Sequence, residues 1–334
     1  MNSVQRIHLS SVEQLQAALG EIFNGQITQS RPGPLEAAFA IAQVDSCDVF
    51  SSSVNRELVC SGQRSRERWT ITPITRRCAG GRFRGQKLED GSLLLLDPGG
   101  EVFQQIEPGH CQFAVSIPVE QASRIIEAEY QVEPDTLLHQ WLHVSDPRVT
   151  ARMERLLMNL LSFNSSHSGA ASFGPGGLAG HVIALAQTGA RPRLLRASLA
   201  HRRRIVRRAE DMIRSRLDRP PSITELCEAT FASRRLLFYA FNELLGRSPA
   251  AHIKNLRMHA ARRRLISGKG HASIQQIAFD LGFGHPGQFA IDYARAFGER
   301  PSQTRCRLGK RAVGQALNNP STSQPRPAPE TRQP

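Results

Sequence analysis

The sequence predicts an α+β chain with two halves: a mostly β N-terminal domain with flanking helices, and an all-α C-terminal domain. Short apolar runs alternate with turn residues between positions 35 and 117. A helical pattern occurs twice between positions 201 and 308. The two halves also differ in net charge, which is −2 over residues 1–195 and +14 over residues 196–310. Such a basic segment is typical of a domain that binds a polyanion.

The N-terminal half contains runs rich in β-branched, aromatic and other apolar residues. Strong turn signals separate them, such as Asp97-Pro98-Gly99-Gly100 and Glu107-Pro108-Gly109-His110. The runs cover residues 37–44, 68–74, 92–96, 101–106 and 112–117. This pattern predicts a mostly antiparallel sheet or a small barrel.

Helical spacing follows from Pro118 and places Leu156, Leu157, Leu160 and Leu161 on one face of the segment 147–161. That face either packs on the sheet or forms a subunit interface, and the pattern leaves both open. Residues 162–180 are rich in Ser, Gly and Ala, which indicates a flexible connection. We therefore expect a domain over 1–165, a linker over 166–200, a second domain over 201–308 and a disordered tail over 311–334.

The first helical unit begins with a basic amphipathic helix over residues 202–216. Ser222 is placed to cap a short second helix, and Ser233 to cap a third that ends at Gly246. Two short helices joined by about three residues have the geometry of a helix-turn-helix. The outward face of the third helix carries Arg234, Arg235, Phe238, Tyr239 and Asn242, residue types that suit a DNA major groove.

A longer helix opens at Ser248-Pro249 and leads to a second copy of the unit. In this copy Ser273 is the predicted cap, and a final helix starts at His285-Pro286 and closes at Gly298. Corresponding apolar positions are 51 or 52 residues apart, as for Leu226 with Ile277 and Phe241 with Tyr293. This spacing indicates an internal duplication.

Several stretches of residues 203–307 resemble the DNA-binding domain of the AraC/XylS family. They are Ser233-Arg234-Arg235 through Phe241, Leu245-Gly246-Arg247-Ser248-Pro249, Leu256-Arg257-Met258 with Ala261-Arg262, Ile277-Ala278 with Leu281-Gly282-Phe283, and Phe289 through Phe297-Gly298-Glu299-Arg300-Pro301-Ser302. Within the family, SRRLLFYAFNELLG and GHPGQFAIDYARAFGERPS are most similar to the ethanolamine operon regulator branch. The resemblance implies a transcription regulator, often an activator, whose N-terminal domain is a cupin-like barrel that senses an effector and dimerises.

The resemblance also implies base contacts from two recognition helices. In the first, the matching positions are Arg235, Phe238 and Tyr239; in the second they are Pro286, Gly287, Gln288 and Ile291, with His285 as a further donor. The second helix departs from the usual polar pattern, since Ile291 stands where Arg or another polar residue is common. We therefore expect the first unit to supply most of the direct base readout.

The alternative is an enzyme, either a metal-dependent cupin or a repair type, fused to the same DNA module. The strand region offers only His110, and the His139/His143 pair has no third ligand at a suitable spacing. None of the six cysteines lies in a recognisable catalytic motif, and we expect them to be reduced and mostly buried. We expect no catalytic residues, no metal and no cofactor.

The interpretation is thus a sequence-specific DNA-binding regulator that responds to a small-molecule effector. Its expected partners are double-stranded operator DNA, the effector, RNA polymerase and a second copy of the chain. No apolar run approaches the roughly 18 residues of a membrane span, and the N-terminus lacks an export signal. We therefore expect a cytoplasmic protein.

Overall fold

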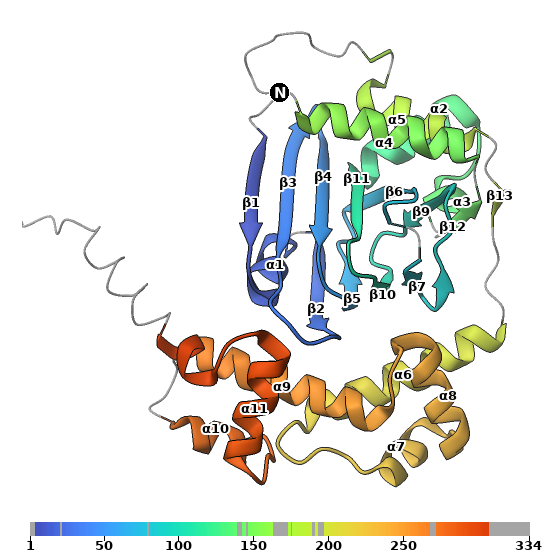
Figure 1. Cartoon of the computed structure of the whole chain (residues 1–334). Helices are drawn as coiled ribbons and strands as arrows, with labels where there is room; N and C mark the ends of the chain where they lie inside the picture. The colour runs from blue at the N-terminus through green and yellow to red at the C-terminus, as the bar shows by residue number, and fades with distance from the viewer. Residues whose placement is uncertain are drawn as a thin grey trace, which may run out of the picture.

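The computed structural model describes residues 4–20, 22–78, 80–138, 142–144, 146–162, 173–174, 176–188, 191–192, 197–267 and 272–306. Its N-terminal half is a layered α+β arrangement, and its C-terminal half is helical (Figure 1). The elements of the N-terminal half are β1 (Gln5–Leu9), α1 (Val12–Ala18), β2 (Phe23–Gln29), β3 (Ala37–Val44), β4 (Cys47–Val54), β5 (Leu58–Arg64), β6 (Arg68–Ile74), β7 (Arg82–Phe83), β8 (Gln86–Lys87), β9 (Ser92–Leu96), β10 (Glu101–Ile106), β11 (Cys111–Pro118), α2 (Val119–Tyr130), α3 (Pro134–Leu138), β12 (Leu142–Val144), α4 (Pro147–Ser162), α5 (Gly177–Gln187) and β13 (Arg191–Pro192).

These strands form two sheets, and every recorded pairing is antiparallel. The large sheet has the order β1-β3-β4-β11-β6-β9-β12-β13, and the small sheet has the order β2-β5-β10-β7-β8. All five strands predicted from the sequence are present as β3, β6, β9, β10 and β11. The cupin-like barrel that we expected is not seen as one closed sheet, because no pairing among the described strands joins the two sheets.

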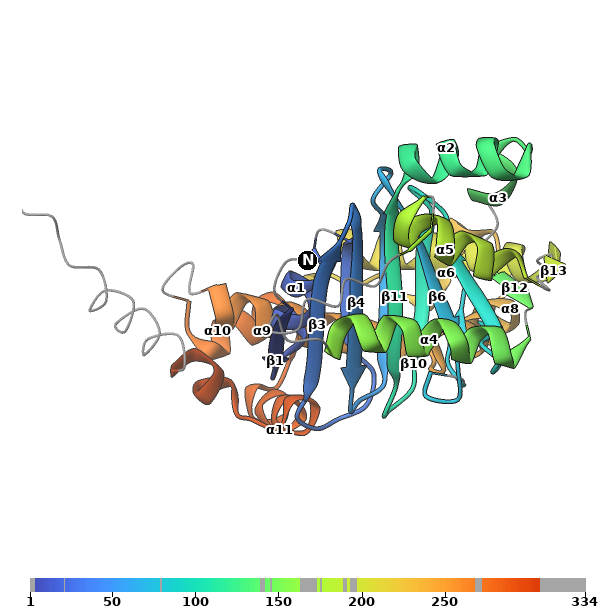
Figure 2. The same cartoon turned by 90° about the horizontal axis from the view of Figure 1, so that it is seen from above.

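Each face of the large sheet covers its own core, because side chains alternate along a strand. Leu93 and Leu95 point toward α2, α4 and α5, whereas Leu94 and Leu96 point toward the small sheet and α1. Figure 2 shows α4 crossing the strands of the large sheet. The apolar face of α4 packs there through Leu157, Leu160 and other residues, as in the first of our two interpretations of this helix.

Helix α5 lies inside the range 166–200 that we expected to be a linker. Seven of its eleven residues are buried, and most of them join the core beneath α2 and α4. The folded part of the N-terminal half therefore continues beyond residue 165. The expected tail over 311–334 lies outside the described residues.

The C-terminal half consists of helices near the positions that the sequence predicts, except that the first begins at residue 197, inside the expected linker, and the segment 301–306 is an additional helical turn. They are α6 (Ala197–Ser215), α7 (Ile223–Thr230), α8 (Arg234–Leu245), α9 (Pro249–Ser267), α10 (Ile274–Asp280) and α11 (Pro286–Phe297), followed by a short helical segment over 301–306. Two separate apolar clusters hold it together, one around α6, α7 and α8 and the other around α10 and α11, and α9 contributes to both. The helices thus form two units joined by α9.

The two halves dock through the small sheet and the segment that follows β2. Val59 and Phe103 of the small sheet belong to the apolar core of the first helical unit. Around them Arg203 bonds to Glu101 at 2.6 Å, and Arg214 donates to Ser61 at 3.1 Å. The N-terminal half therefore shares apolar surface with the first unit as well as polar contacts.

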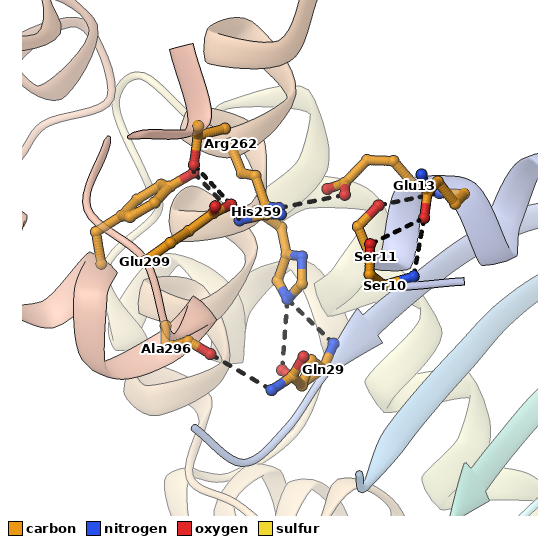
Figure 3. A network of polar contacts seen from close by, with 11 residues as sticks. Ser10, Ser11, Glu13, Gln29, His259, Arg262, Ala296 and Glu299 are labelled. Atoms are coloured by element: carbon orange, nitrogen blue, oxygen red, sulfur yellow. Dashed lines mark hydrogen bonds and ion pairs between the residues drawn. The ribbon is translucent and has the colours of Figure 1, made fainter. Parts of the chain in front are cut away.

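The second unit meets the N-terminal half through a polar network (Figure 3). The backbone N–H of Gln29 donates to Nε2 of His259 at 3.0 Å, and its carbonyl accepts from Asn255 at 2.7 Å. Arg262 forms ion pairs with Glu13 of α1 at 3.2 Å and with Glu299 at 2.8 Å. Both helical units are consequently fixed to the same N-terminal half.

Candidate nucleic-acid interface

The first helix-turn-helix consists of α7, a tight turn and α8. Ser222 caps α7 in a reciprocal capping box: its hydroxyl accepts from the Glu225 N–H at 3.2 Å, and the Glu225 carboxylate accepts from the Ser222 N–H at 2.8 Å. Ser233 caps α8 by accepting from the Leu236 N–H at 3.2 Å. These caps satisfy helix-terminal N–H groups and so fix where each helix starts.

The inward face of α8 is fully buried, which leaves the predicted reading face outside. Leu237, Ala240 and Phe241 are each 0% exposed. Of the predicted contact residues, Arg234, Arg235, Tyr239 and Asn242 are exposed, and Phe238 is half-buried. The arrangement presents cations, an amide and an aromatic edge on one side of a helix, as base contacts in a major groove require.

Arginines support both aromatic side chains of this face. The Arg234 guanidinium lies 5.5 Å from the ring centroid of Phe238, and that of Arg202 lies 5.4 Å from the ring of Tyr239. Arg202 comes from α6 and also bonds to Glu243, with one contact at 3.2 Å. We did not predict a role for Arg202, since the basic run 202–204 gave no indication of which arginine faces α8.

The second helix-turn-helix consists of α10 and α11. Ser273 caps α10, and Pro286 occupies the first turn of α11. A column of rings fills its core, with centroid distances of 5.7 Å from Phe289 to Tyr293 and 4.6 Å from Tyr293 to Phe297. The equivalent positions Leu226 and Ile277, and Phe241 and Tyr293, are all buried, as the internal duplication predicts.

The predicted reading residues of α11 are exposed but offer few free donors. His285, Gly287, Gln288 and Ile291 lie at the surface, and Ile291 is 55% exposed. The Gln288 amide donates to Asp292 at 3.2 Å, and Asp292 pairs with Lys254 at 2.7 Å. Burial raises the pKa of Asp292, but the bonds from Lys254 and Gln288 outweigh it and lower that pKa overall. A negative charge therefore remains next to Gln288.

The structure thus gathers the nine predicted residues into two groups, one on each unit. Figure 1 shows α8 and α11 in different units, with α9 connecting them. A buried polar contact lies behind the exposed face of each unit: His252 hydrogen-bonds to Glu210 at 2.8 Å in the first, and Arg262 forms an ion pair with Glu299 in the second. Burial raises the pKa of Glu210, yet the contacts with His252 and Arg214 lower it overall, so this carboxylate is charged.

Comparison with known proteins identifies this module. Residues 226–307 match a family described as "Helix-turn-helix domain". A XylDLEGF operon transcriptional activator 1 from Pseudomonas putida is 35% identical over 98 residues, which are 29% of this chain and 30% of that protein. A crystal structure of a probable AraC family transcriptional regulator from Rhodopseudomonas palustris is 36% identical, with a TM-score of 0.30, and the match covers 31% of this chain and 96% of that one. The C-terminal module is a helix-turn-helix DNA-binding domain, in agreement with the resemblance to the AraC/XylS family.

A further curated relative matches over a similar length. A probable thc operon regulatory protein from Rhodococcus erythropolis is 32% identical over 100 residues, again 30% of each chain. The chain therefore spans about 30% of the length of the curated relatives it matches. These relatives are named as an operon transcriptional activator and an operon regulatory protein.

Three cysteines of the N-terminal half are buried. Burial raises the pKa of Cys60 to about 12 and those of Cys47 and Cys78 to about 11, so these thiols are neutral. Within the described residues, no group of three or more His, Cys, Asp or Glu side chains could hold a metal ion. The side chains of His139 and His143 lie outside those residues. No helix in the described part of the chain is both long enough and apolar enough to cross a membrane.

Proposed function

We propose that this protein is a cytoplasmic transcription regulator that binds operator DNA through α8 and α11. The observation that carries the proposal is that nine residues predicted for base contact lie on two helices of one AraC/XylS-type domain, eight of them exposed. The two helices would enter successive major grooves on one face of the DNA, about 34 Å apart. The concentration of net charge in this half of the chain would supply the attraction to phosphate.

Direct readout would come mainly from the first unit. Arg234 and Arg235 are exposed near the start of α8, where Arg can pair bidentately with guanine. The second unit would contribute fewer base contacts, because Gln288 is bonded to Asp292 and Ile291 has no donor. Its role would be contact with the DNA backbone and with apolar base edges.

We further propose that the N-terminal half senses a small effector, and that the protein acts as a homodimer in activating RNA polymerase. Support comes from the docking of both helical units on this half, since a change there could alter their relative placement. The relatives named as activators favour positive regulation. We also propose that the sequences of α8 and α11 are similar to those of the ethanolamine operon regulator branch. This similarity concerns the DNA-binding module and therefore does not indicate which effector is sensed.

Selection from a pool of short duplexes at two salt concentrations tests the DNA-binding proposal. We expect enrichment of two half-sites about 10 base pairs apart, with an affinity that falls steeply as salt rises. Binding without enrichment would leave a non-specific DNA-binding protein. Absence of binding would favour a helical module for a protein partner.

Single variants on the selected operator test the unequal readout. We expect Arg235→Ala to weaken binding at least about tenfold, because a bidentate contact to guanine contributes about 1–3 kcal/mol. Gln288→Ala should have a smaller effect, and Arg124→Ala, at an exposed site on α2, should have none. A larger loss for Gln288→Ala than for Arg235→Ala would contradict the assignment.

A further inference from the structure

A small cavity lies between the two sheets of the N-terminal half. Its volume is about 70 Å³, and both sheets and α1 contribute to its wall. Most of the lining is apolar, including Leu15, Ile27, Phe50, Phe83 and Val102. Such a lining excludes water from any charged group inside, and so makes each unpartnered polar atom there costly.

Two lining side chains have polar atoms without a partner. Arg64 lies on the same face of β5 as Leu58 and Cys60, which are both cavity residues. Its Nη2 donates to the Thr70 hydroxyl, but its Nε is buried and makes no hydrogen bond. Gln104 of β10 is 8% exposed, and its Nε2 also lacks a partner. The cavity thus offers a guanidinium donor and an amide donor.

The charge of Arg64 is only partly balanced. Asp97 is the carboxylate that acts on it, but Asp97 also bonds to Arg84 at 2.6 Å. Asp97 therefore acts on two largely buried guanidinium groups, and Glu101 acts on Arg84 in addition. Burial lowers the pKa of Arg64 to about 10 against the opposing effect of Asp97, so the group is still charged at neutral pH. An anion in the cavity would complete this arrangement.

We propose that the cavity binds a small carboxylate with an apolar body, with Arg64 as its counter-ion and Gln104 as a second donor. The volume sets the size, since about 70 Å³ corresponds to roughly five to seven non-hydrogen atoms when each water needs about 10–15 Å³. A short aliphatic carboxylate such as butanoate meets these requirements. The inference rests on the proposed effector-sensing function and gives it a chemical class.

The small sheet separates this cavity from the DNA-binding module by a single layer. Along β5, Cys60 faces the cavity while Val59 packs into the core of the first helical unit. Along β10, Gln104 faces the cavity while Phe103 packs into the same core. A ligand that moves these strands would therefore displace the surface against which α6 and α8 pack.

Calorimetric titration of the full chain with butanoate, and with 1-butanol as the neutral analogue, tests the site. We expect binding of butanoate at least about tenfold tighter than binding of 1-butanol, because only the anion pairs with Arg64. Arg64→Met should remove that preference, and Arg66→Met, at an exposed position in the connection between β5 and β6, should keep it. Equal affinity for the two probes in the wild type, or no binding of either, would overturn the proposal even if Arg64→Met failed to fold.

Operator binding in the same preparation separates this proposal from the proposed function. We expect saturating butanoate to change the affinity for the selected operator severalfold in the wild type and not in Gln104→Met or Arg64→Met. Sequence-specific DNA binding without butanoate binding would refute the site and leave the regulator intact. Butanoate binding without specific DNA binding would refute the regulator and leave the site.

Discussion

Phe231 occupies the turn between α7 and α8 in a conformation that few residues adopt. Its φ of 53° lies in the left-handed region, and the side chain is 86% exposed. Glycine is the usual residue where a helix ends in this way, because it has no Cβ to clash with the following carbonyl. Phe231 therefore strains the turn and gains almost no burial in return.

Replacing Phe231 with glycine should stabilise the first unit. The left-handed conformation costs an L-residue about 1–2 kcal/mol, and the greater chain entropy of glycine offsets part of the gain. We expect Phe231→Gly to raise the free energy of unfolding by about 0.5–1 kcal/mol in urea titration. A lower stability would show that the exposed ring has contacts that offset the strain.

Residue identity predicted which side of α8 and α11 is exposed better than it predicted the buried polar groups. Arg234, Arg235 and Gln288 follow from helical spacing alone, since a buried Leu237 or Phe289 fixes which side faces out. Arg64 and Arg202 could not be assigned in the same way. The surroundings of Arg64 include strands far apart in sequence, and the partner of Arg202 lies 41 residues away on α8.

At the scale of elements, the helix caps were the most predictable features. Ser222, Ser233 and Ser273 each accept a hydrogen bond from the N–H three residues later, at 3.0–3.2 Å. A serine in front of an apolar helical pattern is a local signal and needs no tertiary information. The starts of α7, α8 and α10 were therefore predictable to within a residue.

Removing the cap of α7 should weaken the first unit. In Ser222→Ala the Glu225 N–H loses its acceptor, and we expect a loss of about 1 kcal/mol in the free energy of unfolding. Thermal and urea unfolding of the full chain would measure it. Ser215→Ala, at an exposed site near the end of α6, is the matched control and should change stability by less than about 0.5 kcal/mol.

The sequence analysis missed strands β4 and β5, because their mixture of polar and apolar residues is explained only by the elements that pack on each face of the strand. Strand β4 carries Ser51, Ser52 and Ser53, and β5 carries Gly62 and Gln63, so neither is a continuous apolar run. One face of β5 lines the cavity while the other packs against α6, so the local sequence does not distinguish core from surface. Helix α5 was missed because its Gly- and Ala-rich start resembles a flexible connection.

At the scale of the whole molecule, His259 makes the docking of the two halves sensitive to pH. Its side chain is 2% exposed, and burial lowers its pKa from the ordinary 6.5 to about 3. Between these values the unfolded chain binds a proton that the folded protein excludes, so stability is present above pH 6.5 and falls as the pH decreases. Sequence could not predict this, because the Gln29 partner is 230 residues away.

The pH dependence can be measured by urea unfolding at pH 7.5 and pH 5. We expect His259 to account for about 2 kcal/mol of the stability lost over that interval. His259→Gln retains an acceptor for the Gln29 N–H but does not titrate, so its loss should be smaller by that amount. Equal losses in the two proteins would mean that His259 is protonated in the folded state or that the halves are apart.

The rigid connection between the helical units limits which operators the protein can use. Helix α9 has 19 residues, a length of about 28 Å, and the N-terminal half contacts both the first unit and the middle of α9. The distance between α8 and α11 and their relative orientation are then fixed. Inserting one base pair between the half-sites turns the second groove by about 34–36° away from α11. On such an operator the two units should no longer bind together, and the loss of affinity should be larger than for two units joined by a flexible tether.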